Sequence, residues 1–207
     1  MADQAAVPTR ETFVNAYAGK APWDTGKPQP AFQAVADKIT GSILDSGCGP
    51  GDNALFFAAR GHAVTGFDFL EAPIARAKQK AAERGLTATF CVKDALKLQD
   101  WAERFDNIID SGLFHVFTDA DRVTYVRGLA AVLKPGGRLF LLCFSDATPG
   151  TFGPRRVTQN ELRATFADGW QIESLEPSHF DTRAEARETQ FGGVDPRAWF
   201  LIARRTV

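Results

Sequence analysis

A glycine-rich turn between an apolar strand pattern and a helical pattern constrains the fold of this chain more than any other feature. Residues 42–46 form a short apolar segment, and Gly47, Gly49 and Gly51 follow it at alternate positions. Glycines at a strand-to-helix turn permit a tight bend and a close approach of the backbone to a ligand. The segment therefore predicts an α/β fold with a ligand site at the end of its first clear strand.

Strand patterns alternate with helical patterns along the rest of the chain. Strands are expected at residues 42–46, 62–69, 87–92, 105–110, 138–145, 170–177 and 198–205. Helices are expected after Asp52 and at residues 71–84, 122–133 and 161–168, with a loop or short helix at 94–104. No helical pattern separates the last two strands, so we expect them to pair antiparallel. This alternation predicts an α/β, Rossmann-like three-layer sandwich with a seven-stranded, mostly parallel sheet and an antiparallel last strand.

Charge, hydropathy and cysteine content exclude several classes of protein. The 24 Lys and Arg residues balance 25 Asp and Glu residues, which disfavours a nucleic-acid partner. The longest apolar run, residues 139–144, is far shorter than the roughly 20 residues of a membrane span. Three scattered cysteines argue against a disulfide framework and a cysteine-based zinc site. Because residues 1–12 lack a signal-peptide pattern, we expect a cytoplasmic protein without a membrane partner.

Acidic residues lie at the ends of three successive predicted strands. Asp45 lies two residues before Gly47, where a carboxylate is a poor neighbour for a pyrophosphate but a good one for an ammonium group. Asp68 ends the second strand and can accept hydrogen bonds from both hydroxyls of a ribose. Asp94 follows the third strand and can accept one from an adenine amino group. The three carboxylates predict a ligand with an α-amino group and a ribose but no phosphate.

These residues resemble the motifs of class I S-adenosylmethionine-dependent methyltransferases. Residues 44–51 resemble the first motif of that family. Residues 66–68 resemble the segment that contains its second conserved acidic residue, and residues 93–95 resemble the segment whose acidic residue lies beside the adenine. Residues 133–141 resemble its loop and fifth strand. The resemblance covers roughly residues 30–207 and implies S-adenosylmethionine as the cofactor.

The resemblance also implies a division of the chain and a set of cofactor-binding residues. A single domain over residues 1–207 would have an N-terminal lid at 1–30 and a Rossmann-like core at 30–207. The expected cofactor-binding residues are Trp23, Asp45, Gly47, Cys48, Gly49, Gly51, Asn53, Asp68, Phe69, Asp94, Ala95, Asp110 and Ser111.

Trp23 stands among turn residues in the N-terminal segment 21–30. One interpretation is that its indole fills the rim of the core, and the other is that it covers the cofactor. Residues 22–26, P-W-D-T-G, resemble the thiopurine and thiol/halide methyltransferase branch, in which the tryptophan packs over the cofactor. Residues 153–156 resemble a Gly-Pro segment of the same branch. The first motif departs from some members of the branch, which argues against a halide substrate.

Methyl transfer from a sulfonium needs alignment and exclusion of water more than a catalytic triad or a metal. The candidate catalytic residues are His115 and Asp110. His115 is either a general base, with an unperturbed pKa near ~6.5, or a hydrogen-bonded core residue. Asp110 can instead hold the cofactor or a loop N–H. The expected substrate-binding residues are Phe13, Tyr17, Phe114, His115, Phe144, Phe152 and Arg155.

The sequence thus predicts transfer of a methyl group to S, O or N of a small, apolar, aromatic molecule by a monomer or homodimer. One alternative is an NAD(P)-dependent oxidoreductase, which the glycine spacing and Asp45 disfavour. The other is a module that binds S-adenosylmethionine without catalysis.

Overall fold

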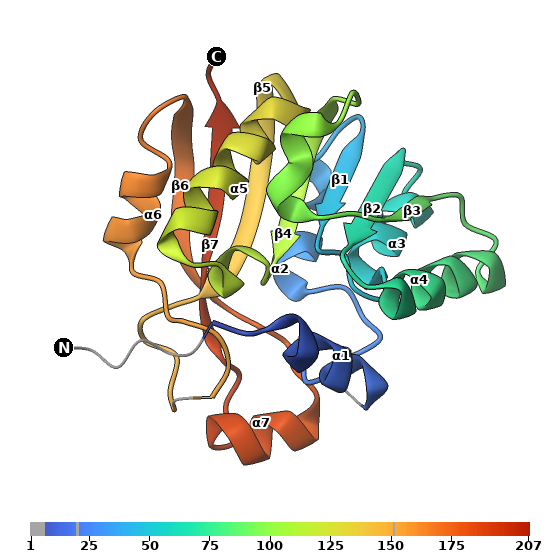
Figure 1. Ribbon diagram of the computed structural model, residues 1–207, viewed down its shortest axis with the longest axis vertical. Coiled ribbons are helices and arrows are strands. Elements are labelled where there is room, and N and C mark those ends of the chain that lie inside the picture. The colour runs from blue at the N-terminus through green and yellow to red at the C-terminus, as the bar shows by residue number, and fades with distance from the viewer. Residues whose placement is uncertain (1–6, 20, 151) are drawn as a thin grey trace.

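The computed structural model describes residues 7–19, 21–150 and 152–207. Within them, one sheet has the strand order β3-β2-β1-β4-β5-β7-β6, with helices on both faces (Figure 1). The strands are β1 (Ile43–Ser46), β2 (Val64–Asp68), β3 (Thr89–Val92), β4 (Phe105–Ser111), β5 (Leu133–Phe144), β6 (Trp170–His179) and β7 (Arg197–Arg205). Strands β1 to β5 pair in parallel, and β7 pairs antiparallel with β5 and β6. This arrangement confirms the predicted Rossmann-like sandwich.

The helices divide between the two faces of the sheet. They are α1 (Arg10–Ala18), α2 (Pro30–Ala34), α3 (Asp52–Ala59), α4 (Glu71–Glu83), α5 (Asp119–Val132), α6 (Gln159–Thr165) and α7 (Ala184–Phe191), with 3-10 turns η1 (Ala36–Lys38), η2 (Ala95–Asp100) and η3 (Phe114–Val116). Phe32, Leu55 and Ile74 join α2, α3 and α4 to one hydrophobic core. Leu129 and Leu162 join α5 and α6 to the other.

Successive strand residues alternate between these two cores. Ile43 lies in the first core and Leu44 in the second, while Ile109 lies in the first and Ile108 in the second. Side chains of a strand point to opposite faces in turn, so a strand covered on both faces is apolar throughout. This explains the continuous apolar runs that the sequence shows.

Local capping residues fix where the helices begin. Thr158 and Glu161 form a reciprocal capping box at the start of α6. Thr118 accepts a hydrogen bond from the Asp121 amide at the start of α5. Pro73 lies in the first turn of α4, where its missing N–H has no helical partner to lose.

Helices α1 and α7 were not predicted, and neither was the five-residue helix α2. Helix α7 lies between β6 and β7, although the two strands still pair antiparallel as expected. It buries only Ala186 and Phe191, too few apolar residues to give a helical pattern in the sequence. Helix α1 begins with a capping box of Thr9 and Thr12 and buries only Tyr17. Helices α1 and α7 lie at the bottom of Figure 1, at the same end of the sheet.

Two smaller expectations were also wrong. The helix expected after Asp52 begins at Asp52 itself, and its N-cap is Gly51 with a φ of 82°. Strand β5 begins at Leu133 and includes the Lys134–Gly137 segment, where a loop was expected. Leu133 pairs with Phe105 before the register shifts.

No helix within the described residues is long and apolar enough to cross a membrane.

Candidate functional site

The glycine turn lies at the carboxyl end of β1 and is closely covered by two other segments. Gly47 and Gly49 have φ values of 67° and 51°, in the left-handed region that favours glycine. A Cβ on Gly49 would lie 2.7 Å from the Tyr17 hydroxyl of α1, and one on Gly47 would lie 3.0 Å from the Leu113 side chain. The turn therefore presents bare backbone to a narrow space beneath α1 and the segment after β4.

Asp45 carries the most perturbed carboxyl group of the site. It is 1% exposed, and neither carboxylate oxygen has a hydrogen-bond partner among the described residues. Burial raises its pKa to about 8, and the carboxylates of Asp110 and Asp68 add to the shift. The nearby amide of Ala54 offsets only part of this effect. A buried carboxylate without a partner at a side-chain-free turn fits the ammonium group that the sequence predicts there.

Asp68 and Asp94 lie along the same edge of the sheet. Asp68 accepts hydrogen bonds from the amides of Gly49 at 3.2 Å and Leu70 at 3.0 Å, and burial raises its pKa. A carboxylate has about four lone-pair sites, so these bonds leave room for two hydroxyl donors. Asp94 is exposed, and its side chain caps η2 through the Leu96 amide at 2.9 Å. Because β3 pairs in parallel with β2, Asp94 lies one strand further out than Asp68.

An aromatic cluster from α1 and the following segment covers this edge. The Trp23 Nε1 donates to the Tyr17 hydroxyl at 3.3 Å, and Trp23 remains 37% exposed. The Phe13 ring lies 5.6 Å from that of Phe69, which directly follows β2. Tyr17 was expected on the substrate side, but its hydroxyl faces Gly49 of the glycine turn.

Hydrogen bonds tie the N-terminal segment to two other parts of the chain. Arg76 of α4 donates to a carbonyl of α1 at 3.0 Å. The side chain of Gln29 exchanges two hydrogen bonds with the backbone of Asp181, at 3.0 and 2.9 Å. The Arg183 amide donates to the carbonyl of Pro22 at 2.9 Å. The segment over the glycine turn and the β6–α7 connection therefore form one continuous cover.

Asp110 is fully buried and fully engaged. It accepts hydrogen bonds from the amides of Leu113 at 2.8 Å and Phe114 at 3.1 Å, and from the Tyr125 hydroxyl at 2.8 Å. The Tyr125 oxygen also lies 2.7 Å from Ser46 Oγ, at the end of β1. Burial raises the pKa of Asp110 to about 6, and these hydrogen bonds oppose the shift. Asp110 thus shapes the turn that follows β4, and the geometry speaks against its transferring a proton.

His115 is held in an aromatic environment. It is 6% exposed, and its Nδ1 accepts a hydrogen bond from the Phe144 amide at 2.9 Å. Its ring lies 4.6 Å from the Phe144 ring and 5.7 Å from the Phe180 ring. Burial lowers its pKa to about 3, and the charges of Arg122 and Arg156 add to the shift. An imidazole in this state does not take up a proton near neutral pH, so the geometry contradicts the general-base interpretation.

The rings of Phe144, Phe180 and Phe191 form an aromatic wall beside His115. Two of these residues, Phe180 and Phe191, were not predicted from the sequence. The Phe180 and Phe191 rings lie 5.2 and 5.9 Å from the Phe144 ring. The exposed ring of Phe152 packs against Phe191 at 5.9 Å. Phe180 directly follows β6, and Phe191 ends α7. Both lie in a stretch with few apolar residues, so their isolation among polar residues is the one sequence signal that could have pointed to them.

Two expected substrate residues lie elsewhere. Phe114 is 0% exposed and packs in the second core, 5.9 Å from the Phe166 ring, so the substrate assignment was wrong. Arg155 pairs with Asp119 and Glu161, which ties its loop to α5 and α6.

The remaining predicted site residues have structural contacts of their own. Asn53 accepts a hydrogen bond from the Gln29 amide at 2.9 Å. Cys48 is buried next to Gly66, and Ala95 is buried at the start of η2. Ser111, the last residue of β4, is half-buried.

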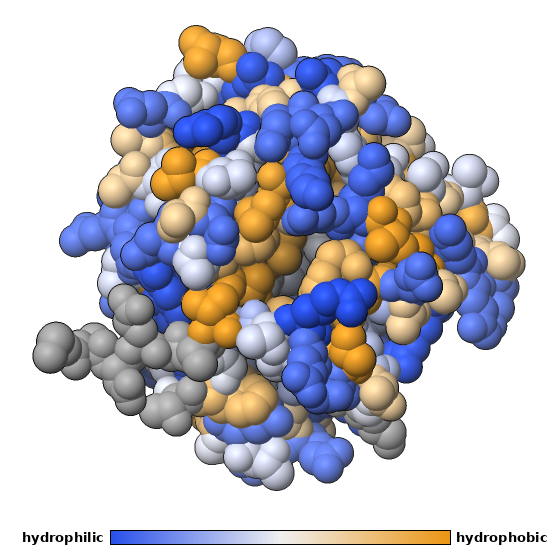
Figure 2. Space-filling model, viewed as in Figure 1, coloured by the Kyte–Doolittle hydropathy of each residue, from blue (hydrophilic) through white to orange (hydrophobic). Residues whose placement is uncertain are grey.

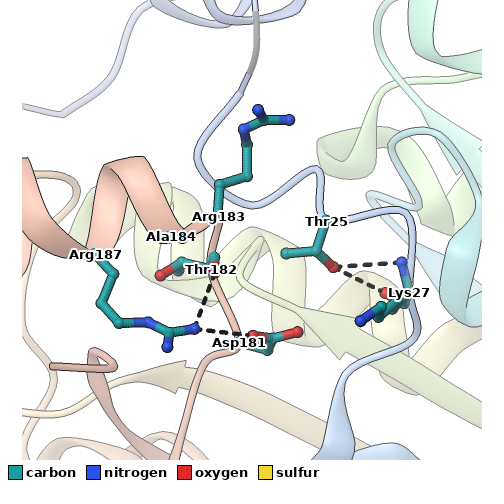
Figure 3. A pocket seen from close by; sticks show the side chains of 7 residues that line it. All are labelled: Thr25, Lys27, Asp181, Thr182, Arg183, Ala184 and Arg187. Carbon is teal, nitrogen blue, oxygen red and sulfur yellow. Dashed lines mark hydrogen bonds and ion pairs between the residues drawn. The ribbon is translucent and has the colours of Figure 1, made fainter. Parts of the chain in front are cut away.

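A separate polar cavity lies between the N-terminal segment and the start of α7. Its volume is about 340 Å³, and it is lined by Thr25, Lys27, Asp181, Thr182, Arg183, Ala184 and Arg187 (Figure 3). Arg187 is paired with Asp181 and Asp195 there. Its polar lining distinguishes it from the aromatic wall at His115. Figure 2 shows hydrophobic surface within a hollow near the middle of the molecular face, surrounded by hydrophilic residues.

Known proteins resemble this chain along most of its length. A family model described as a methyltransferase domain matches residues 43–137. The 2-heptyl-1-hydroxyquinolin-4(1H)-one methyltransferase of Mycobacteroides abscessus is 34% identical over 95% of this chain and 97% of its own. Probable thiol methyltransferase 2 of Arabidopsis thaliana is 31% identical over 61% of this chain and 58% of its own. A structure solved in a study of the conversion of a disulfide bond into a thioacetal group during echinomycin biosynthesis has a TM-score of 0.82 and 36% identity, over 96% of this chain and 93% of that chain.

Proposed function

The chain belongs to the class I S-adenosylmethionine-dependent methyltransferases, and we propose that it methylates an ionisable oxygen or sulfur on a small aromatic heterocycle. Its activity is the S-adenosylmethionine-dependent methylation of a small molecule. The observation that supports this class of acceptor is the aromatic wall at His115, which contains no base for the acceptor. The hydroxyquinolone named for the relative from Mycobacteroides abscessus supports the same class of acceptor.

The carboxylates at the strand ends are proposed to hold the cofactor. S-adenosylmethionine supplies, when bound, a methyl group on a sulfonium that is open to in-line attack. Asp45 would pair with the ammonium group, and Asp68 would accept from the ribose hydroxyls. Asp94 would accept from the adenine amino group. Tyr17 and Trp23 would cover the cofactor as part of an N-terminal lid.

The acceptor must provide its own nucleophile, because the wall offers no base. The pKa of His115 is about 3, and its Nδ1 is occupied. Asp110 is committed to the turn after β4. A hydroxyl or thiol that ionises near neutral pH reacts without a base, whereas an aliphatic alcohol does not. The aromatic rings of Phe144 and Phe180 favour a flat apolar body for the acceptor.

A methyl-transfer screen tests this proposal. Release of S-adenosylhomocysteine would be measured with hydroxyquinolones, phenols, aromatic thiols, aromatic amines and aliphatic alcohols. We expect turnover of the acidic aromatic hydroxyls and thiols and none of the aliphatic alcohols. Equal activity on aliphatic alcohols would refute the proposal. Binding of S-adenosylmethionine without turnover of any acceptor would favour the non-catalytic module, and tighter binding of NAD would favour the oxidoreductase.

Several further properties remain predictions. The net charge of -1 favours a small acceptor over a nucleic acid. A cytoplasmic location and a monomeric or homodimeric state are also expected, and sedimentation analysis would decide between the two states.

A further inference from the structure

We propose that His115 selects the acceptor by donating a hydrogen bond from its Nε2–H to an oxygen of the acceptor, which is a role opposite to that of a base. This inference rests on the proposed function, because it concerns the same acceptor site. It narrows the preferred acceptor to an aromatic oxygen nucleophile rather than a thiol or an amine.

The hydrogen bond at Nδ1 determines which nitrogen of His115 carries the proton. The Phe144 amide can only donate, so Nδ1, at 2.9 Å, must be unprotonated. A neutral imidazole then carries its proton on Nε2 and can only donate from there. Burial and the charges of Arg122 and Arg156 keep the ring neutral. The backbone of β5 thus fixes both the tautomer and the orientation of the ring.

The Nε2 edge of His115 faces a place where a side chain is missing. A Cβ on Gly112 would lie 3.3 Å from Nε2 and 3.6 Å from the Phe180 ring. Gly112 has a φ of 85°, so another residue there would be strained. Among the described residues, Nε2 has no hydrogen-bond partner, whereas Nδ1 has one. With glycine at position 112 no side chain covers the Nε2 edge, and Nε2 is not among the fully enclosed unpaired polar atoms of the described residues, so a ligand atom can approach it.

The charge around this donor favours an acceptor oxygen that is ionised. The Arg156 guanidinium lies 5.3 Å from the centre of the Phe144 ring. It donates to the carbonyls of Phe152 and Pro154, both at 2.8 Å, so it is held in place with its charge intact. Hydrogen bonds to an ionised oxygen are stronger than those between neutral groups. An aromatic amine presents N–H donors to Nε2–H and would be disfavoured, and sulfur is a weak hydrogen-bond acceptor.

Three substitutions at position 115 separate the effect of the Nε2–H donor from that of side-chain packing. His115→Leu removes both nitrogens. His115→Asn keeps an acceptor for the Phe144 amide but cannot reach the Nε2 position. His115→Gln places an amide N–H near that position. Each variant would be assayed with a hydroxyquinolone and with an aromatic thiol, together with the Kd for S-adenosylmethionine and the melting temperature.

We expect His115→Leu and His115→Asn to raise KM for the hydroxyquinolone by about 10- to 100-fold, as for a lost hydrogen bond to a charged group. KM for the thiol should change by less than about threefold, because sulfur gains little from the donor. The Kd for S-adenosylmethionine should stay constant, and His115→Gln should recover most of the hydroxyquinolone affinity. If one variant fails to fold, the other removes the same donor.

Two results would overturn the inference. Equal KM values for the hydroxyquinolone in wild type and in a folded His115→Asn variant would exclude the donor. A large loss of kcat at constant KM, together with loss of the acidic limb of the pH profile, would identify His115 as a base instead. Both results require a wild-type enzyme that methylates the hydroxyquinolone. If the wild type does not, the proposed function itself fails, and the two failures are thereby distinguished.

Discussion

Substitution of Asp45 by asparagine tests the electrostatics of the cofactor site. The pKa of Asp45 is about 8 in the protein without ligand, so only about 1% of the molecules carry the carboxylate at pH 6 and about 10% at pH 7. An ammonium group of the cofactor pairs with the ionised form. The apparent Kd is the intrinsic Kd divided by the competent fraction. Affinity for S-adenosylmethionine should therefore rise about tenfold per pH unit between pH 6 and 7.

Isothermal titration calorimetry measures this effect directly. At pH 7 wild-type binding should release close to one proton, which is detected by comparing buffers with different ionisation enthalpies. In Asp45→Asn the affinity should fall by about 10- to 100-fold, as for a lost charge-assisted hydrogen bond, and most of the pH dependence should disappear. A smaller slope from Asp68 would remain, because burial raises the pKa of that carboxyl group too.

The exposed Asp94 provides the matched control. Asp94→Asn removes one charge from the same edge, so affinity should fall while the pH slope persists. The unliganded wild type should also lose stability as pH rises towards about 8, because a raised carboxyl pKa favours the folded state only while the group is protonated. In Asp45→Asn the free energy of unfolding should change less over the same pH range. A wild-type Kd that is constant from pH 6 to 7.5 would refute the reasoning.

Three further predictions probe the rest of the site. Tyr125→Phe removes a buried donor to Asp110, so the free energy of unfolding should fall by about 2–3 kcal/mol and the melting temperature by about 4–12 °C. A melting temperature within about 1 °C of wild type would contradict this. Gly49→Ala places a Cβ 2.7 Å from the Tyr17 hydroxyl at a φ of 51°, so affinity for S-adenosylmethionine should fall at least about tenfold. The double variant Gly49→Ala/Tyr17→Phe should recover part of the lost affinity for S-adenosylmethionine in the same titration. Trp23→Ala should raise KM for S-adenosylmethionine by about 3- to 10-fold, and retention of activity by Trp23→Phe would distinguish lost cover from misfolding.

The geometry of the edge that carries the three acids could be predicted because its determinants are local. Gly47, Gly49 and Asp45 lie within five residues, and the geometry of a strand-to-helix turn follows from that short pattern. Asp68 ends β2 and Asp94 closely follows β3, and these strands pair in parallel with their neighbours. Carboxyl ends of parallel strands meet at one edge, so the sequence alone places the three acids together.

The aromatic wall at His115 could not be predicted because its contacts join distant segments. His115 is defined by the amide of Phe144 and the ring of Phe180, which lie 29 and 65 residues further along the chain. From the sequence Arg155 was expected to bind the substrate, but in the folded protein it pairs with Asp119 of α5 and Glu161 of α6. Such partners depend on packing between elements, which periodicity does not reveal.

The two hydrogen bonds between Gln29 and the backbone of Asp181 have a kinetic consequence. They join parts of the cover that lie 152 residues apart in sequence. When one part moves away from the sheet, the other must follow or lose both bonds, so the glycine turn and the aromatic wall become accessible in one event. We therefore expect both ligands to gain access in the same opening event, so that either can bind first. Product-inhibition patterns in steady-state kinetics would distinguish this random order from a compulsory one.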